Sequence, residues 1–213
     1  MTFFDFLIIA ASAYLLGSLS FAIIVCRLTL HRDIRNYGSG NAGLTNAYRT
    51  MGAAKTLLVL FGDIAKGAVA ISIGGMLAGP IGKLIAGVFV ILGHVFPVYF
   101  GFRGGKGVLV GATMLALFDW RIFLVAIALF ILAVATTRWV SLGSILGAAS
   151  FPVTMWIFYQ DALLTGIALA MGVAVIFMHR SNIRRILAGT ENRFSFHVKP
   201  TIRKDDEEAG GSK

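Results

Sequence analysis

The sequence has little charge and almost no cysteine. Only 14% of its 213 residues are charged, whereas 57% are hydrophobic, and the mean hydropathy is +0.83. Because soluble domains carry roughly a quarter charged residues, this composition excludes a water-soluble globular protein and predicts a chain dissolved largely in lipid. The single cysteine, Cys26, excludes an internal disulfide and a cysteine-rich metal site.

Basic residues outnumber acidic ones by 19 to 10, which gives a net charge of +9. This excess suits a membrane protein that faces anionic lipid or binds phosphate-bearing substrates. The chain has no basic helix interleaved with aromatic residues, so we do not expect nucleic acid as a partner. It also has no cluster of histidines or carboxylates with metal-ligand spacing. We therefore expect no metal and no cofactor, and nothing points to a protein partner.

Seven apolar runs predict an all-α integral membrane protein with seven transmembrane helices, some of them short. A helix of about 20 apolar residues crosses the hydrocarbon core. The first run has no signal-peptide cleavage pattern, so we expect it to be a retained span. The runs are Phe6–Val25, Thr56–Leu77, Ile81–Phe102, Val108–Phe118, Ile122–Ala135, Val140–Tyr159 and Ala162–Met178.

The number of spans depends on whether Val108–Ala135 is one helix or two short ones broken near Asp119. Lys and Arg are in excess on cytoplasmic loops. With two helices, every basic residue except Lys66, Lys83 and Arg121 falls on one side of the membrane. We therefore predict seven spans, with the N-terminus outside and the C-terminus inside. Val108–Phe118 is short, so it must tilt little, carry interfacial flanking residues or lie in thinned bilayer.

The chain is predicted to contain one transmembrane domain, residues 1–198, and a polar tail, residues 199–213. The tail carries four consecutive acidic residues from Asp205 to Glu208 and is too polar to pack, so we expect it to be disordered. Most of the 25 glycines are expected to let membrane helices approach one another closely.

The first of three polar segments runs from Arg35 to Arg49. Its glycines allow backbone N–H groups to converge on an anion, and an arginine can hold a phosphate through two parallel hydrogen bonds. An ordinary glycine-rich connector is an equally good interpretation of the composition alone. The side chains that can hydrogen-bond a ligand are Ser39, Asn41, Thr45 and Asn46.

The second polar segment is Gly93-His-Val-Phe-Pro97 followed by Phe102-Arg-Gly-Gly-Lys-Gly107. Gly104, Gly105, Lys106 and Gly107 precede a predicted helix, whose N-terminal N–H groups attract anions. Val108 stands where a nucleotide-binding P-loop needs a hydroxyl, so nucleotide binding loses support. The alternative is a simple turn with a snorkelling lysine.

The third polar segment contains His179-Arg-Ser-Asn-Ile-Arg-Arg185 and then Gly189-Thr-Glu-Asn-Arg193. His179, Asn182 and Arg185 recur at helical spacing and share a face. Anchoring to anionic lipid would explain the basic residues. It would not explain Asn182 and Glu191.

Several polar residues lie within or beside the apolar runs. Asp63 and Lys66 are three residues apart, which predicts an ion pair buried in the helix bundle. His94 is expected to be an interhelical hydrogen-bonding residue. Ser141 and Ser144 can donate to a phosphate, although helix capping explains Ser141 equally well.

Together the three segments resemble the bacterial acylphosphate:glycerol-3-phosphate acyltransferases. The similarity runs from about Gly17 to about Arg193, and Leu44 replaces a residue that is commonly small in the family. The matching motifs are Gly-Ser-Gly-Asn-x-Gly-x-Thr-Asn-x-x-Arg at 38–49, Gly-His-x-Phe-Pro with Gly-Gly-Lys-Gly at 93–107, and His-Arg-x-Asn-Ile-x-Arg with Gly-x-Glu at 179–191.

The resemblance implies a multi-span enzyme of the bacterial inner membrane with a cytoplasmic active site. Such an enzyme transfers an acyl group from acyl phosphate to glycerol 3-phosphate and produces lysophosphatidic acid, the first step of phospholipid synthesis. The resemblance further implies that Ser39, Arg49, His179 and Asn182 are catalytic. By the resemblance, Gly104 to Gly107 would bind glycerol 3-phosphate and Glu191 would give structural support. From the polar residues themselves we expect Arg35 to give structural support and the following residues to bind substrate: Asn41, Thr45, Asn46, Ser141 and Ser144.

A transporter or flippase for a phosphorylated metabolite or lipid is the alternative prediction. A basic pocket among broken helices would also serve a transporter. A transporter is expected to carry polar residues at mid-membrane in several spans and to show internal symmetry. Only Asp63, Lys66 and His94 approach that pattern, so we rank the transporter second.

Overall fold

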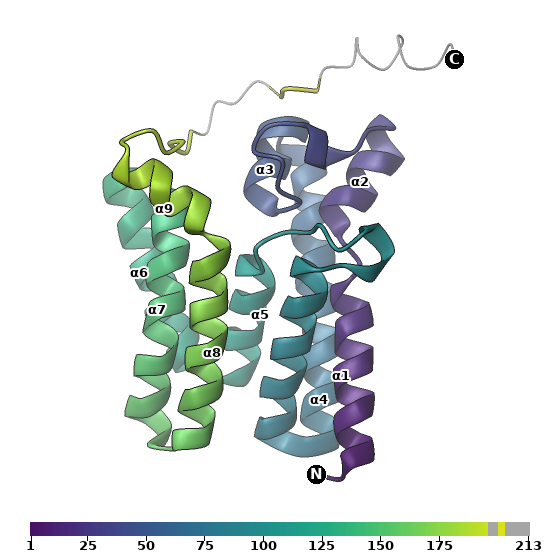
Figure 1. Ribbon diagram of the computed structural model, residues 1–213, viewed down its shortest axis with the longest axis vertical. Coiled ribbons are helices and arrows are strands. Elements are labelled where there is room, and N and C mark those ends of the chain that lie inside the picture. Colours follow the sequence, from purple (N-terminus) through teal and green to yellow (C-terminus); the bar gives the residue numbers. More distant parts are fainter. Residues whose placement is uncertain (196–199, 203–213) are drawn as a thin grey trace.

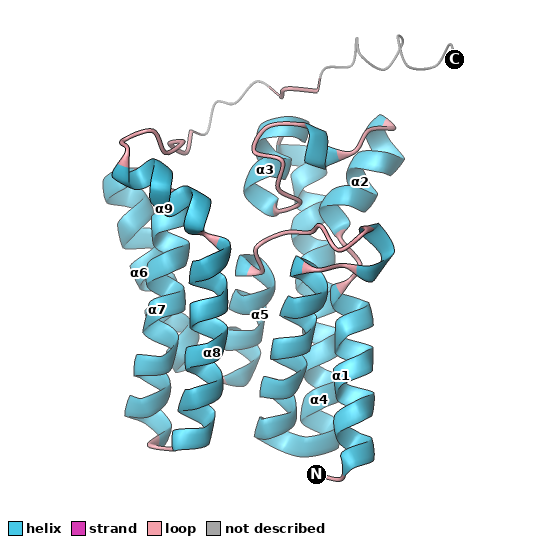
Figure 2. Ribbon diagram, viewed as in Figure 1, coloured by secondary structure: helices cyan, strands magenta, loops and turns pink. Residues whose placement is uncertain are grey.

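The computed structural model describes residues 1–195 and 200–202, and all regular secondary structure in this part of the chain is helical (Figures 1 and 2). Figure 1 shows α1 to α4 grouped on one side and α6 to α9 on the other, with α5 between them. The α-helices are α1 Phe3–Gly17, α2 Phe21–Leu30, α3 Leu44–Met51, α4 Ala53–Val95, α5 Val108–Phe118, α6 Trp120–Thr137, α7 Val140–Tyr159, α8 Ala162–Met178 and α9 Arg180–Leu187.

Three helices begin and end where the apolar runs predict. These are α5, α7 and α8. The stretch Val108–Ala135 forms two helices, because Asp119 has extended backbone and caps α6 by accepting a hydrogen bond from Arg121 N at 2.9 Å. A carboxylate at this position satisfies one of the N–H groups that the helix itself leaves unpaired.

Helix α4 consists of two antiparallel limbs. The backbone leaves helical geometry at Ala78 and at Gly79, which has φ +57°, and Pro80 starts the second limb. Gly74 and Gly82 then face each other so closely that a Cβ on either would clash with the carbonyl oxygen of the other. The first limb corresponds to the predicted run Thr56–Leu77. The second limb corresponds to Ile81–Phe102 but ends at Val95, so the predicted end at Phe102 is wrong.

The predicted helix Phe6–Val25 is interrupted, since α1 ends at Gly17 and α2 begins at Phe21. An interruption in an apolar segment needs internal hydrogen-bond partners for the exposed backbone groups. Lys66 Nζ donates to Leu19 O at 2.7 Å, and Ser18 Oγ accepts from Val98 N at 3.3 Å. The Lys66 side chain from α4 therefore satisfies the freed carbonyl of Leu19, and the backbone of the loop after α4 donates to the Ser18 hydroxyl.

Four helical stretches of residues 1–195 are long and apolar enough to cross a membrane, or five if α8 and α9 are counted as one bent span. Helix α5 is a shorter apolar helix, and the two limbs of α4 are counted as one stretch. Large apolar side chains point outward around the bundle, among them Phe61, Ile131 and Phe177. This surface suits lipid and is unsuited to water.

The described end of the chain returns to α3. Ile202 N donates to Thr50 O at 3.1 Å, and the Ile202 side chain is buried against α2 and α3. The rest of the predicted polar tail, at 199 and 203–213, lies outside the described residues, as do residues 196–198.

The close approach of the two α4 limbs leads to a prediction on stability. Gly74→Ala forces the limbs apart, and overpacking of this kind costs about 1–3 kcal/mol, so we expect a lower thermal unfolding midpoint in detergent. Gly166→Ala is the matched control, because a Cβ on Gly166 in α8 would have no neighbour within 4 Å. Equal midpoints for the two variants would contradict the packing described here.

Candidate active site

One cavity of about 380 Å³ lies between the two groups of helices. Residues from all three polar segments and from the start of α7 line it. The predicted site residues that line the cavity are Ser39, Asn41, Thr45, Asn46, Arg49, Lys106, Gly107, Ser141, Ser144, His179, Asn182 and Glu191.

Asn46, which is 2% exposed, fixes the backbone conformation of the first polar segment. Asn46 Oδ1 accepts from Ser39 N at 2.9 Å, and Asn46 Nδ2 donates to Tyr37 O at 3.1 Å. Gly38 and Gly40 have φ of +60° and +71°, a conformation that glycine adopts without strain. Asn46 therefore holds the loop that presents the exposed side chain of Ser39.

Gly104 and Gly105 do not line the cavity, although both are predicted to bind substrate. They lie behind Lys106, where Gly104 N donates to Val95 O and Gly105 N donates to His94 O, both at 3.0 Å. A side chain at either position would clash with the end of α4. Because they have no side chain, these glycines allow the loop that carries Lys106 to pack directly against the end of α4.

Arg35 also lies outside the cavity lining. Its guanidinium forms two hydrogen bonds with Asp33, Nε to Oδ1 at 2.9 Å and Nη2 to Oδ2 at 2.8 Å. Its Nη1 donates to Phe100 O at 2.6 Å. Arg35 thus connects the first polar segment to the loop before Gly104, an arrangement that suits a supporting residue.

Glu191 is the centre of a hydrogen-bond network that joins the second and third segments. Its Oε1 accepts from Ser141 Oγ at 2.8 Å and from Asn182 Nδ2 at 2.6 Å, and its Oε2 accepts from Arg185 Nε at 2.7 Å. With its Nδ2 held in this way, Asn182 turns Oδ1 toward Lys106 and accepts a hydrogen bond from Nζ. One carboxylate therefore fixes groups from three elements.

Burial and charge set the protonation of these groups. Burial, followed by repulsion from Arg185, lowers the pKa of Lys106 to about 8. Burial also lowers the pKa of Arg49. Burial acts to raise the pKa of Glu191, but hydrogen bonds from Asn182, Ser141 and Arg185 bring it below its ordinary value. The cations Arg49, Lys106 and Arg185 thus lie with the carboxylate of Glu191 at the polar end of the cavity, which we call the mouth. The net positive charge of the mouth favours binding of anions.

Helices that begin at the cavity have no side-chain caps. The N-cap residues of α3, α5 and α7 are Gly43, Gly107 and Trp139, and none of them has a side chain that accepts a hydrogen bond from the first turn of its helix. Side chains of Thr2, Asp119 and Asp161 cap α1, α6 and α8, whereas α2, α4 and α9 also lack a side-chain cap. Uncapped N–H groups carry partial positive charge and are suited to binding a phosphate.

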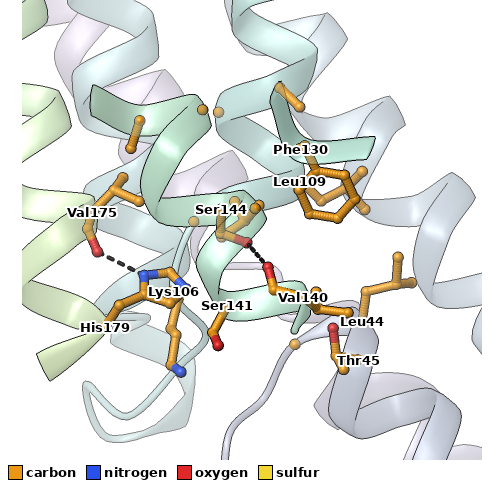
Figure 3. A pocket seen from close by; sticks show the side chains of 18 of the residues that line it. Leu44, Thr45, Lys106, Leu109, Phe130, Val140, Ser141, Ser144, Val175 and His179 are labelled. Atoms are coloured by element: carbon orange, nitrogen blue, oxygen red, sulfur yellow. Dashed lines mark hydrogen bonds between the residues drawn. The ribbon is translucent and has the colours of Figure 1, made fainter. Parts of the chain in front are cut away.

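Figure 3 shows how the polar side chains of the cavity are held. His179 Nδ1 lies 2.8 Å from Val175 O, so Nδ1 carries the hydrogen and Nε2 of the neutral ring keeps its lone pair. Ser144 Oγ donates to Val140 O at 2.9 Å. Since Ser141 donates to Glu191, both serine hydroxyls already have acceptors within the protein, and donation to a substrate requires them to turn.

The rest of the cavity is lined by apolar residues and lies between α5, α6, α7 and α8; we call this part the apolar arm. A cavity with a charged mouth and an apolar arm suits a ligand that has an anionic head and a hydrocarbon chain. The sequence did not indicate which helices would line it. The large apolar side chains of the arm are Leu109, Leu115, Phe123, Ile127, Phe130, Phe151, Met171 and Val175.

Four further polar residues of the cavity were not predicted as site residues: Asp63, His94, Arg185 and Asn192. The predicted ion pair is confirmed, with Lys66 Nζ 2.7 Å from Asp63 Oδ1 and both side chains 1% exposed. Arg185 carried a signal, because it shares a helical face with Asn182. Among the residues that the structure describes, no group of three His, Cys, Asp or Glu side chains could hold a metal ion.

The fold and the cavity define an integral membrane helical protein with a site for an anionic amphiphile. A protein-family model described as glycerol-3-phosphate acyltransferase matches residues 7–189. A glycerol-3-phosphate acyltransferase of Geobacter sulfurreducens is 44% identical, covering 88% of this chain and 97% of that protein. One of Thermoanaerobacter sp. strain X514 is 41% identical, covering 86% and 93%. This chain belongs to the glycerol-3-phosphate acyltransferase family.

Solved structures agree with this assignment. The glycerol 3-phosphate form of PlsY, an integral membrane glycerol 3-phosphate acyltransferase, superposes with a TM-score of 0.83 at 33% identity, covering 89% of this chain and 96% of that one. The lysophosphatidic acid form gives a TM-score of 0.80 at 32% identity, covering 90% and 96%. The chain is therefore an acyltransferase, and the transporter alternative is set aside.

Proposed function

We propose that this enzyme transfers a fatty acyl group from acyl phosphate to the sn-1 hydroxyl of glycerol 3-phosphate. The products are lysophosphatidic acid and inorganic phosphate. The observation that carries the proposal is the cavity itself, in which Arg49, Lys106 and Arg185 surround a mouth that opens into an apolar arm. Two phosphorylated reactants need several cations, and a fatty acyl chain needs an apolar channel.

The reaction requires positioning more than a covalent intermediate. Acyl phosphate is a mixed anhydride with a good leaving group, so the glycerol hydroxyl oxygen attacks the acyl carbon directly. The new ester bond forms, the bond from the acyl carbon to the phosphate oxygen breaks, and phosphate leaves. The protein holds both anions side by side and stabilises the negative charge that develops on the acyl oxygen.

Each polar segment takes one part of this task. Lys106, His179 and Asn182 bind glycerol 3-phosphate, while Ser39 and Arg49 bind the acyl phosphate head group. Glu191 keeps Asn182 and Arg185 in position through the hydrogen bonds described above. Asn46 contributes by holding the loop that presents Ser39. The contacts to the two head groups are completed by Asn41, Thr45, Ser141 and Ser144.

The proton of the attacking hydroxyl passes to a phosphate oxygen of one of the substrates. His179 Nε2 is the alternative acceptor, because burial lowers the pKa of His179 to about 4 and the neutral ring keeps a lone pair on Nε2. The substrate is the better candidate, since a phosphate oxygen lies beside the hydroxyl in any productive arrangement.

The proposed membrane arrangement has seven spans. They are α1 with α2, the two limbs of α4, α5, α6, α7 and α8, with the N-terminus outside and the C-terminus in the cytoplasm. The distribution of basic residues supports this orientation, because all except Lys66, Lys83 and Arg121 then lie on the cytoplasmic side. The enzyme would reside in the bacterial inner membrane with its active site facing the cytoplasm.

Purified protein tests the proposed function directly. Phosphate release from palmitoyl phosphate in detergent should require glycerol 3-phosphate and should be matched by lysophosphatidic acid formation. Palmitoyl-CoA in place of palmitoyl phosphate is the control donor and should support no transfer. Transfer from the thioester alone, or phosphate release that ignores glycerol 3-phosphate, would refute the proposal.

Replacement of Lys106 should separate binding from chemistry. In Lys106→Ala we expect the KM for glycerol 3-phosphate to rise about tenfold, the scale of one charged hydrogen bond, and kcat to fall less. Lys83→Ala is the matched control, because Lys83 donates to Leu117 O away from the cavity. An unchanged KM in Lys106→Ala would overturn the assignment.

The pKa of Lys106 predicts an alkaline limb in the pH profile. The free ammonium is charged below about pH 8 and loses its charge as the pH rises through that value. Because kcat/KM reports the pKa values of the free enzyme, kcat/KM for glycerol 3-phosphate should decline above about pH 8. In Lys106→Arg, which stays charged, the decline should move to higher pH. The same limb in both variants would assign it to another group.

His179→Gln distinguishes the two proton acceptors. Glutamine keeps hydrogen-bonding capacity but cannot take the proton, so we expect turnover to persist with an unchanged acidic limb if the substrate phosphate is the base. The measurement is the pH dependence of kcat at saturating concentrations of both substrates. Loss of the acidic limb together with most of the rate would identify His179 as the base.

A further inference from the structure

A buried group of polar residues lies beneath the loop that carries Lys106, and none of the steps above uses it. We call Asp63, Lys66 and His94 the buried triad. Asp63 and Lys66 lie in the first limb of α4, and His94 lies at the end of the second limb. All three side chains are at most 5% exposed. Polar residues in apolar spans are costly and are retained mainly where they have a function.

The contacts of Lys66 fix the hydrogen position on His94. An ammonium group has three hydrogens and accepts none. Lys66 Nζ lies 2.7 Å from Leu19 O, 2.7 Å from Asp63 Oδ1 and 3.0 Å from His94 Nδ1. Because the ammonium can only donate, His94 Nδ1 is the acceptor in this contact. The neutral imidazole then carries its hydrogen on Nε2.

The Nε2 side of His94 supports the loop. A side chain at Gly105 would clash with His94 Nε2, so the glycine backbone rests directly on the edge of the ring. The main chain adds a hydrogen bond from Gly105 N to His94 O at 3.0 Å. Lys106 follows immediately and reaches Asn182. The loop that carries Lys106 therefore packs directly on the His94 ring.

We infer that His94 is a positioning residue, oriented by the ion pair of Lys66 and Asp63. It holds the backbone of Gly104 to Gly107 in the position from which the Lys106 ammonium contacts glycerol 3-phosphate. The buried triad acts through Lys106 and does not itself react. This inference rests on the proposed binding of glycerol 3-phosphate by Lys106. It adds a role for Asp63 and Lys66, which lie within a span and outside the three polar segments.

Two substitutions of His94 test the inference. In His94→Asn the amide oxygen can still accept from Lys66, but nothing fills the place of Nε2 beneath Gly105. In His94→Gln the longer amide reaches that place. We expect the KM for glycerol 3-phosphate to rise about tenfold in His94→Asn, because a displaced Lys106 forfeits one charged hydrogen bond to the substrate, and clearly less in His94→Gln. The KM for acyl phosphate should stay unchanged in both variants.

Combination with Lys106→Ala separates positioning from general stability. Residues that act through one contact have non-additive effects, so His94→Asn should raise the KM no further when Lys106 is already absent. A merely structural role predicts that the two effects multiply. Multiplied effects, wild-type KM values in both His94 variants, or equal rises in the KM for both substrates would overturn the inference.

Hydrogen exchange gives a readout that does not depend on activity. The peptide containing Gly104 to Gly107 should exchange faster in His94→Asn than in wild type, with His94→Gln between them, while a peptide from α8 stays unchanged. Unchanged exchange at Gly104 to Gly107 would contradict the inference whatever the enzyme assay gives. Inactive wild-type protein with the expected exchange pattern would instead contradict the proposed function alone.

Discussion

The hydrogen-bond network of Glu191 is the interaction on which the site depends. One carboxylate accepts from Ser141, Asn182 and Arg185, and through Asn182 it aligns Lys106. Without it, three cations would face one another across a partly apolar cavity, and their mutual repulsion would separate the helices that carry them. The carboxylate balances part of that charge and leaves a net positive mouth that two phosphorylated substrates can neutralise.

The N-termini of the helices that begin at the cavity also favour anion binding. Where α3, α5 and α7 begin at the cavity, their first N–H groups have no side-chain caps. Uncapped helix ends reduce the stability of the unoccupied enzyme and favour binding of anions. The apolar arm between α5 and α8 then places an acyl chain beside these charges, so that one cavity serves both halves of an amphiphilic donor.

Much of this organisation could be predicted from the sequence, because apolar runs and polar motifs are local signals. The bounds of α5, α7 and α8 follow from uncharged runs, and the buried pair of Asp63 and Lys66 follows from helical spacing. The interruption at Leu19 could not be predicted, since the donor that satisfies it comes from Lys66, far along the chain. The positions of Gly104 and Gly105 behind the cavity and the helices that form the apolar arm likewise depend on tertiary packing.

The central claim is that three separate polar segments form one site for two phosphorylated reactants. A crystal structure with glycerol 3-phosphate and a non-reactive acylphosphonate bound together tests it most directly. The account predicts both phosphorus groups in the same cavity, one in hydrogen-bond contact with Lys106 and the other with Arg49, and the acyl chain between α5 and α8. Phosphorus groups in two unconnected cavities, or an acyl chain lying outside the arm, would contradict it.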